Sequence, residues 1–183
     1  MSVSAVKTAA NSDNDDGLSE ENLEIIAPGS HSGTQQFITF TVDSEEYGIA
    51  ITSVLEIKGW TETTRLPNQP EYLLGVLNLR GVIVPIMDLR FRFGIGKTEV
   101  SNTNVIIIVS IEDRYIGILV DAVSDILTVS QNDIQTVPNL DGSRRDHFLS
   151  GLVTIENRMV AILELVRLLE IASDLDELMS TTE

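Results

Sequence analysis

The sequence contains no cysteine, which excludes disulfide bonds, thiolate metal ligands and a cysteine nucleophile. Long apolar runs are also missing, and the stretch from Val105 to Val109 is far shorter than a membrane span. The N-terminal residues have no apolar run of signal-peptide length. We therefore expect a soluble cytoplasmic protein without direct membrane insertion.

Basic residues are scarce, because 12 Lys and Arg residues stand against 28 Asp and Glu residues, for a formal net charge of −16. The adjacent pair Arg144-Arg145 lies beside Asp141 and Asp146. Nucleic-acid binding requires clustered basic side chains that neutralise phosphates. We therefore expect no nucleic-acid partner.

The residue sets that carry metal binding or phosphate binding are incomplete. His31 and His147 are far apart and have no partner at metal-ligand spacing, so we expect no metal site. The stretch "GIGKT" at 94–98 lacks the glycine that a phosphate-binding loop needs five positions before Gly96, where Phe91 stands. We expect no cofactor and no enzymatic activity.

Composition divides the chain into a folded part and two ends. Residues 1–34 are rich in Ser, Asn, Asp and Gly and lack periodicity, so we expect an acidic flexible tail. The folded part should span residues 35–170, and residues 171–183 should hold the end of a C-terminal helix and an acidic tail. An apolar stripe at helical spacing predicts that helix: Leu165, Leu168, Leu169, Ala172 and Leu175.

The folded part contains an internal repeat. Residues 37–57 align without a gap on residues 106–126, and residues 72–89 align on residues 148–165. The two copies span approximately 36–95 and 104–169 and are rich in β-branched residues interrupted by turn residues. Each copy reads as a hairpin, an irregular stretch and a second hairpin. We expect an all-β fold of two small pseudo-repeated barrels packed on a shared hydrophobic core, with a short C-terminal helix.

Equivalent positions of the two copies separate structural residues from the others. Gly75 and Gly151 coincide at a strand start, where a missing side chain allows close backbone approach. Asp88 and Glu164 also coincide, and helix capping explains such a pair better than paired-carboxylate catalysis does.

The turn at Arg80-Gly81 coincides with Glu156-Asn157 in the second copy. Gly81 and Asn157 both tolerate positive φ, so the second turn position has a backbone reason. The first position, occupied by Arg in one copy and Glu in the other, shows no such reason. Arg80 therefore either binds a partner or is only an exposed turn residue. The residues alone do not decide between these two interpretations.

Three segments in their order and spacing resemble the CheW family of chemotaxis coupling proteins: "EEYGIAITSVLEI" (45–57), "NLRGVIVPIMDLR" (78–90) and "RYIGILVDAVSDIL" (114–127). The resemblance covers about residues 35–170. It implies two five-strand SH3-like barrels around a shared core. It also implies a non-enzymatic adaptor that links chemoreceptor signalling tips to the regulatory domain of a CheA-type histidine kinase, recruited to membrane receptor arrays.

The resemblance also implies a partner-binding surface in this sequence. The receptor-binding groove between the barrels would include Val54, Glu56, Val105, Val123 and Ile126. Glu56 and Arg80 match the family's acid–arginine pair, which is associated with coupling. The alternative function is a β-barrel module or enzyme that binds a small ligand, unrelated to chemotaxis.

Overall fold

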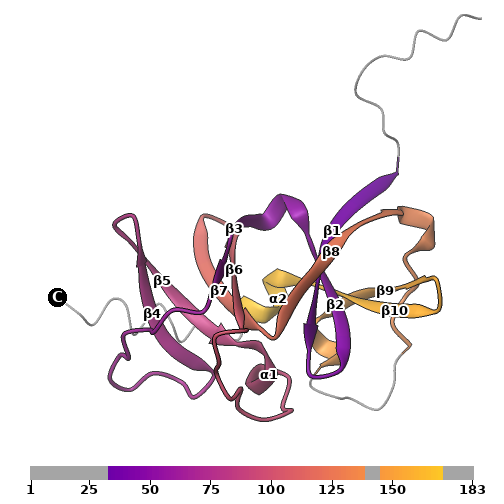
Figure 1. Cartoon of the computed structure of the whole chain (residues 1–183). Helices are drawn as coiled ribbons and strands as arrows, with labels where there is room; N and C mark the ends of the chain where they lie inside the picture. The colour runs from indigo at the N-terminus through magenta and orange to yellow at the C-terminus, as the bar shows by residue number, and fades with distance from the viewer. Residues whose placement is uncertain (1–32, 139–144, 171–183) are drawn as a thin grey trace, which may run out of the picture. The chain divides into compact units, whose positions relative to one another are not determined.

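The computed structural model describes residues 33–138 and 145–170, and strands dominate these residues (Figure 1). The strands in chain order are β1 (Thr34–Val42), β2 (Glu45–Ala50), β3 (Val54–Gly59), β4 (Leu73–Leu79), β5 (Val82–Asp88), β6 (Val105–Ile111), β7 (Arg114–Val120), β8 (Ala122–Ser130), β9 (Leu149–Ile155) and β10 (Arg158–Leu163). The helices are α1 (Leu89–Arg92) and α2 (Leu165–Glu170), with 3-10 turns η1 (Ile51–Ser53), η2 (Gln131–Asp133) and η3 (Asp146–Phe148).

Some predictions fall outside the described residues. These are the predicted tail up to residue 32, the C-terminal segment 171–183 and His31. Regular structure begins one residue before the predicted start, because β1 already includes Thr34.

The strands form two five-stranded sheets, and this confirms the predicted all-β class with two five-strand units. Sheet A has the order β8-β1-β2-β10-β9, and sheet B has the order β3-β6-β7-β5-β4. Each sheet contains a parallel pair, β10 with β2 and β5 with β7. The remaining neighbours are antiparallel.

Sheet membership does not follow the repeat boundaries. Sheet A joins the opening hairpin of the first copy, β1–β2, to the last three strands of the second copy. Sheet B joins the opening hairpin of the second copy, β6–β7, to β3, β4 and β5 of the first. The structure thus differs from the expectation that each copy builds its own barrel. The two copies exchange their opening hairpins, and each sheet needs both halves of the chain.

Each sheet closes through a short bridge between its two edges. Beyond β3, Thr64 exchanges two backbone hydrogen bonds with Val76 of β4, at 3.0 and 2.8 Å. Beyond β8, Gln135 exchanges two with Leu152 of β9, both at 2.8 Å. In each sheet the segment that follows one edge strand therefore meets the other edge strand, and we name the sheets closed in this way barrel A and barrel B.

Three hydrophobic clusters are formed by the described residues. Barrel B is filled by a cluster around Ile86 and Ile106, and barrel A by one around Phe37 and Val153. The largest cluster draws residues from both sheets, and this is the predicted shared core. A row of aromatic rings runs through it, with centroid separations of 6.2, 5.0 and 6.0 Å along Phe40, Tyr47, Phe93 and Phe148.

The turns of the β4–β5 and β9–β10 hairpins differ from the prediction at their first position. Arg80 has φ 52° and Gly81 has φ 90°, while Glu156 has φ 46° and Asn157 has φ 72°. Positive φ at both central residues is the two-residue hairpin geometry that matches strand twist. The first turn position therefore also requires a positive φ, a conformation that is unfavourable for Arg and Glu.

Candidate partner-binding surface

An exposed apolar strip begins at β3, the edge strand of barrel B. Residues opposite each other in register share one face of a sheet. Val54 lies opposite Val109, and Ile57 lies opposite Ile107, and both partners belong to the shared core. Val105 packs on the same core from the start of β6. Ile57 is 42% exposed, so this face of β3 reaches solvent along its edge.

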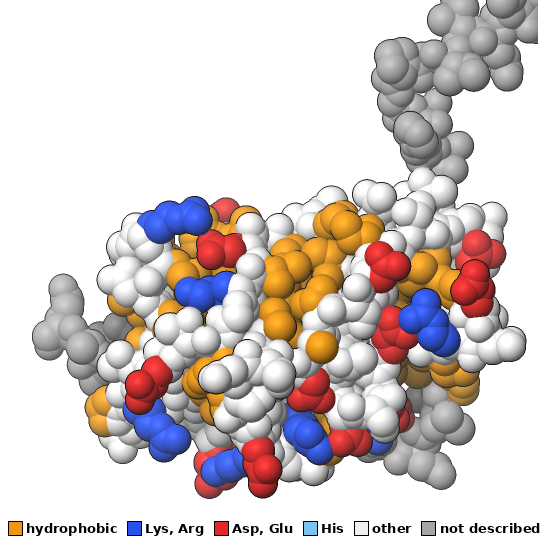
Figure 2. Space-filling model, viewed as in Figure 1, with side chains coloured by type: hydrophobic (Ala, Val, Ile, Leu, Met, Phe, Trp, Pro, Cys, Tyr) orange, Lys and Arg blue, Asp and Glu red, His pale blue; other side chains and the backbone are white. Residues whose placement is uncertain are grey.

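The strip continues on β8, the edge strand of barrel A. Val123 lies opposite Phe40, a member of the shared core, and Ile126 lies opposite Ile38 on the same side of β1. Ile126 is 53% exposed. We name the five residues Val54, Ile57, Val105, Val123 and Ile126 the apolar margin. In the space-filling view, hydrophobic side chains gather across the middle of the face, between β3 and β8 (Figure 2).

Both edge strands carry a bulge at equivalent repeat positions. In β3 the register shifts between Val54 and Glu56, and in β8 it shifts between Val123 and Ile126. The β8 bulge faces Thr39, whose buried hydroxyl bonds the backbone N and O of Asp125 at 3.2 Å. Bulges bend a strand and re-aim its side chains. The two bulges therefore set how both edges of the apolar margin face solvent.

Glu56 and Arg80 form a separate part of the surface. Glu56 lies opposite Ile108, a residue of the barrel B core, so it sits on the opposite face of β3 from Val54 and Ile57. Its Oε2 accepts a hydrogen bond from Nη2 of Arg80 at 3.3 Å. The two side chains are 36% and 88% exposed. This ion pair connects the edge strand β3 to the tip of the β4–β5 hairpin, and we call it the clasp of barrel B.

The structure thus groups the residues singled out in the sequence into two sets. Val54, Val105, Val123 and Ile126 share the apolar margin, while Glu56 and Arg80 pair beside it.

Sequence reasoning missed several exposed aliphatic side chains near these two sets. Ile57 belongs to the apolar margin, Leu55 occupies the β3 bulge, and Val82 and Ile83 follow the Arg80-Gly81 turn at the start of β5. The available signal was weak: in "VLEIKG" the two exposed aliphatic residues, Leu55 and Ile57, are two positions apart, but Val54 beside them breaks the alternation. It could not be used without knowing that β3 is an edge.

The two repeat-equivalent glycines lie at the closing bridges. A Cβ on Gly75, which has φ 139°, would meet the carbonyl oxygen of Thr64. A Cβ on Gly151 would meet the side chain of Ile134 and lie 3.1 Å from the carbonyl oxygen of Gln135. Both positions therefore have steric reasons for glycine. Gly81 has a conformational one, since nothing lies near its missing Cβ and its φ is 90°.

Asp88 is buried, with 1% exposure, and its predicted capping role is confirmed. Its carboxylate accepts hydrogen bonds from the backbone N of Phe91 at 3.2 Å, from the backbone N of Thr98 at 2.8 Å and from Oγ1 of Thr98 at 2.7 Å. The repeat extends to the backbone: Asp88 N donates to Tyr72 O, and Glu164 N donates to Phe148 O, both at 2.8 Å. The Asp88 carboxylate therefore holds α1 and the segment at Thr98 in place, which is a structural role.

A buried tyrosine links the shared core to charged groups at the surface. The Tyr47 hydroxyl donates to Oε2 of Glu45 at 2.6 Å, and Arg145 pairs with the same oxygen. Burial, reinforced by the hydrogen bond to Glu45, raises the pKa of Tyr47 from 10.0 to about 12.

The described residues hold no group of three His, Asp or Glu side chains that could bind a metal. His147 packs edge-on against Phe148, with ring centroids 6.5 Å apart. No helix in the described part of the chain is both long and apolar enough to cross a membrane.

Comparison with known proteins gives consistent matches. The model of the CheW-like domain matches residues 36–173. The chain is 43% identical over 134 residues to chemotaxis protein CheW of Rhizobium meliloti (strain 1021), covering 73% of this chain and 86% of that protein. It is 39% identical over 135 residues to chemotaxis protein CheW of Klebsiella aerogenes, covering 74% and 81%.

A solved structure agrees with these matches. The crystal structure of scaffolding protein TtCheW from Thermoanaerobacter tengcongensis superposes with a TM-score of 0.67 at 33% identity, over 75% of this chain and 88% of that one. The family model matches most of the chain, and the relatives and the solved structure agree with it. This chain therefore belongs to the CheW family of chemotaxis scaffold proteins.

Proposed function

We propose that this chain links the cytoplasmic signalling tips of chemoreceptors to the regulatory domain of a CheA-type histidine kinase, as a cytoplasmic protein recruited to receptor arrays. The family is one of non-enzymatic scaffolds that couple receptors and kinase in chemotaxis. A small-ligand module or an enzyme has no comparable support.

The apolar margin is the surface that we assign to the receptor. Three partly buried valines that pack on the shared core lie near the exposed Ile57 and Ile126 at two sheet edges, and apolar patches of this kind mark protein interaction sites. Ile126 and Ile57 would bury the largest exposed areas of the five residues. This surface is the observation that carries the proposal.

We assign the Glu56–Arg80 pair to the polar rim of the same receptor-binding surface. Arg80 occupies a turn position with φ 52°, where Gly or Asn would be less strained. Its ion pair with Glu56 is too exposed to contribute much stability. A planar guanidinium can make two directed hydrogen bonds to a partner, which an ammonium cannot reproduce. The side chain therefore fits a binding role better than a folding role.

Co-sedimentation with receptor-containing membranes and kinase tests this assignment. Ile126→Asp should weaken sedimentation with receptor membranes by about tenfold or more, because it places a charge in a desolvated contact. Arg80→Glu should reduce receptor-dependent kinase activation and leave the melting temperature nearly unchanged. Arg80→Lys should be intermediate if directed hydrogen bonds matter, and near normal if charge alone matters.

Val100→Asp is the matched control, since Val100 is an exposed aliphatic residue in the connection between α1 and β6. It should sediment and activate like the parent. Folded Ile126→Asp and Arg80→Glu proteins that couple receptor to kinase as well as the parent would remove both surfaces from the proposal.

A further inference from the structure

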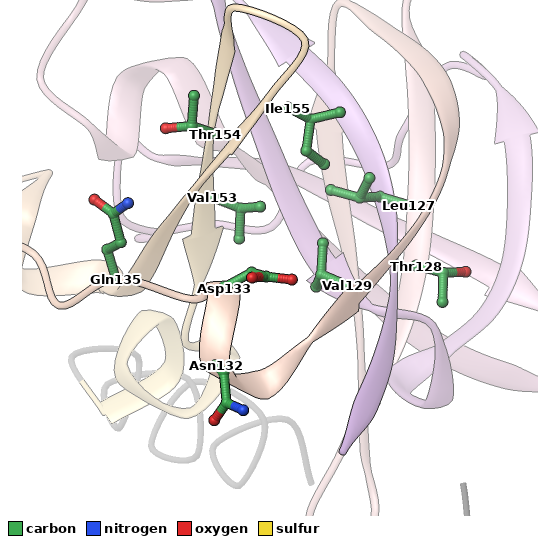
Figure 3. Close-up of a pocket in the computed structure, with 9 residues that line it drawn as sticks. All are labelled: Leu127, Thr128, Val129, Asn132, Asp133, Gln135, Val153, Thr154 and Ile155. Carbon is green, nitrogen blue, oxygen red and sulfur yellow. The ribbon is translucent and has the colours of Figure 1, made fainter. Parts of the chain in front are cut away.

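The mouth of barrel A is open beside its closing bridge. A hollow of about 390 Å³ lies between β8 and β9, close to η2, near the lower end of the volume range of ligand pockets. Four aliphatic side chains and the Asp133 carboxylate face this space: Leu127, Val129, Val153 and Ile155 (Figure 3). Val129 and Val153 also belong to the barrel A core, so nearly buried valines form the floor of the mouth, while polar groups supply most of its exposed lining.

The equivalent mouth of barrel B carries different residues. Trp60 occupies the repeat position of Val129 and packs on the barrel B core, with its backbone N bonded to Asn104 O at 2.9 Å. Glu56 and Arg80 clasp that mouth at 3.3 Å. Their equivalents in barrel A are Asp125 and Glu156, two acids that cannot form an ion pair with each other. Barrel A thus lacks both the large side chain and the clasp.

The backbone at this mouth has unused pairing capacity. β8 and β9 are the two edges of sheet A, and each pairs with one neighbouring strand, β1 and β10 respectively. Beyond the bridge at Gln135 and Leu152, no ladder joins them among the described residues. Edge strands with unpaired N–H and C=O groups accept an added extended segment.

The charges around the mouth select the kind of segment. Asp133 lines the hollow, Glu156 follows Ile155 at the rim, and Asp125 lies on β8 two residues before Leu127. None of the residues that line the hollow is basic. Acidic groups next to an apolar floor attract Lys or Arg beside small aliphatic side chains.

We propose that the open mouth of barrel A binds a short extended peptide segment of a partner protein, in which small aliphatic side chains alternate with basic ones. The segment pairs with the exposed edge of β8 or β9. Its aliphatic side chains enter the hollow over Val129 and Val153, and its basic side chains meet Asp133 and Glu156. This site is separate from the apolar margin, whose β8 residues Val123 and Ile126 face the shared core.

Amide NMR titration of the full chain with two capped hexapeptides tests the site. One peptide alternates valine and lysine, and the other alternates valine and glutamate. The lysine peptide should shift amides of residues 127–135 and 152–156 in a saturable way. The glutamate peptide should bind at least about tenfold more weakly, because it meets like charges. Shifts spread over the whole acidic surface, or no shifts at millimolar peptide, would overturn the site.

The other barrel supplies the matched variants. Glu156→Arg places at the rim of barrel A the positive charge that Arg80 provides in barrel B. This change should weaken binding of the lysine peptide roughly three- to tenfold. Val129→Trp adds the side chain that Trp60 provides in barrel B and should abolish binding. If Val129→Trp does not fold, the Glu156→Arg variant alone tests the proposal, because residue 156 is exposed and its replacement should not disturb the fold. A folded Glu156→Arg protein that binds the lysine peptide like the parent contradicts the proposal.

Discussion

The closing bridges of the two barrels occupy equivalent repeat positions but differ in what crowds their glycine. In barrel B the missing Cβ of Gly75 would meet backbone of Thr64, and Gly75 itself has φ 139°. In barrel A the missing Cβ of Gly151 would meet chiefly the side chain of Ile134. A side chain can move aside, whereas a hydrogen-bonded backbone carbonyl and a left-handed backbone cannot. Residues that coincide in a repeat therefore need not be equally intolerant of change.

Replacing the two glycines gives the largest expected effect. Gly75→Val should destabilise the fold by about 3 kcal/mol or more, because it combines backbone strain with a backbone clash. Gly151→Val should cost roughly 1–2 kcal/mol, since Ile134 can repack. Urea denaturation of both variants measures the difference. Equal losses would show that the clash at Ile134 is as rigid as the one at Thr64.

The carboxylates at the equivalent repeat positions 88 and 164 extend the comparison. Asp88→Ala should cost about 2 kcal/mol, because it leaves the backbone N of Phe91 and Thr98 without their acceptor in a buried place. Glu164→Ala should cost less than about 1 kcal/mol, since Glu164 is only partly buried. Thermal melts of both variants measure this. A larger loss at Glu164 would reverse the ranking of the two repeats.

Alkaline pH should affect the two opening hairpins differently. Tyr47 of β2 can ionise, whereas the equivalent residue of β7 is Ile116. The pKa of Tyr47 is raised to about 12 in the folded protein from 10.0. The folded state thus holds its proton more tightly, so this stability is complete below pH 10.0 and is lost as pH rises toward about 12. The loss should be roughly 3 kcal/mol, because each pKa unit corresponds to about 1.4 kcal/mol.

Denaturation at a series of alkaline pH values checks this loss. Tyr47→Phe should lose stability at neutral pH, because Glu45 loses its hydroxyl donor, but should show a flatter decline over the alkaline window. An unchanged decline in Tyr47→Phe would assign the alkaline effect to other groups.

Two ion pairs on the protein surface should show the smallest effects. Arg80 pairs with Glu56 at 3.3 Å, and Arg158 pairs with Glu46 at 3.2 Å. The Glu46 side chain is 14% exposed against 36% for Glu56. Arg80→Ala should change stability by less than about 0.5 kcal/mol, and Arg158→Ala by up to about 1 kcal/mol. Salt titration of the melting temperature measures both, and a larger loss at Arg80 would give that side chain a structural role.

The repeat made much of the fold predictable, because equivalent turn residues, glycines and β-branched runs mark equivalent strands. The exchange of opening hairpins was not predictable from one chain. β1 and β6 have the same pattern, so local residues do not say which of them pairs with β3 and which with β8. Pairing depends on packing over the whole molecule, which periodicity does not contain.

The candidate site was only partly readable for a similar reason. Val54, Val105, Val123 and Ile126 came from family resemblance, because an exposed isoleucine and a buried one look alike in sequence. Ile57 was missed since its exposure follows from the edge position of β3. The strain at Arg80 was missed as well, because the first turn position was judged by its residue types and not by its φ.

The hairpin exchange has a consequence for how the chain folds as it is synthesised. Ile38 of β1 finds its partner Ile126 88 residues later, and β2 pairs with β10, near the end of the described chain. The β1–β2 hairpin therefore leaves the ribosome long before the other strands of its sheet exist. Contacts so distant in sequence slow folding, because a long loop must close before they form. Nascent chains released before β10 would contain neither completed barrel A nor a covered shared core, and would depend on chaperones or be degraded.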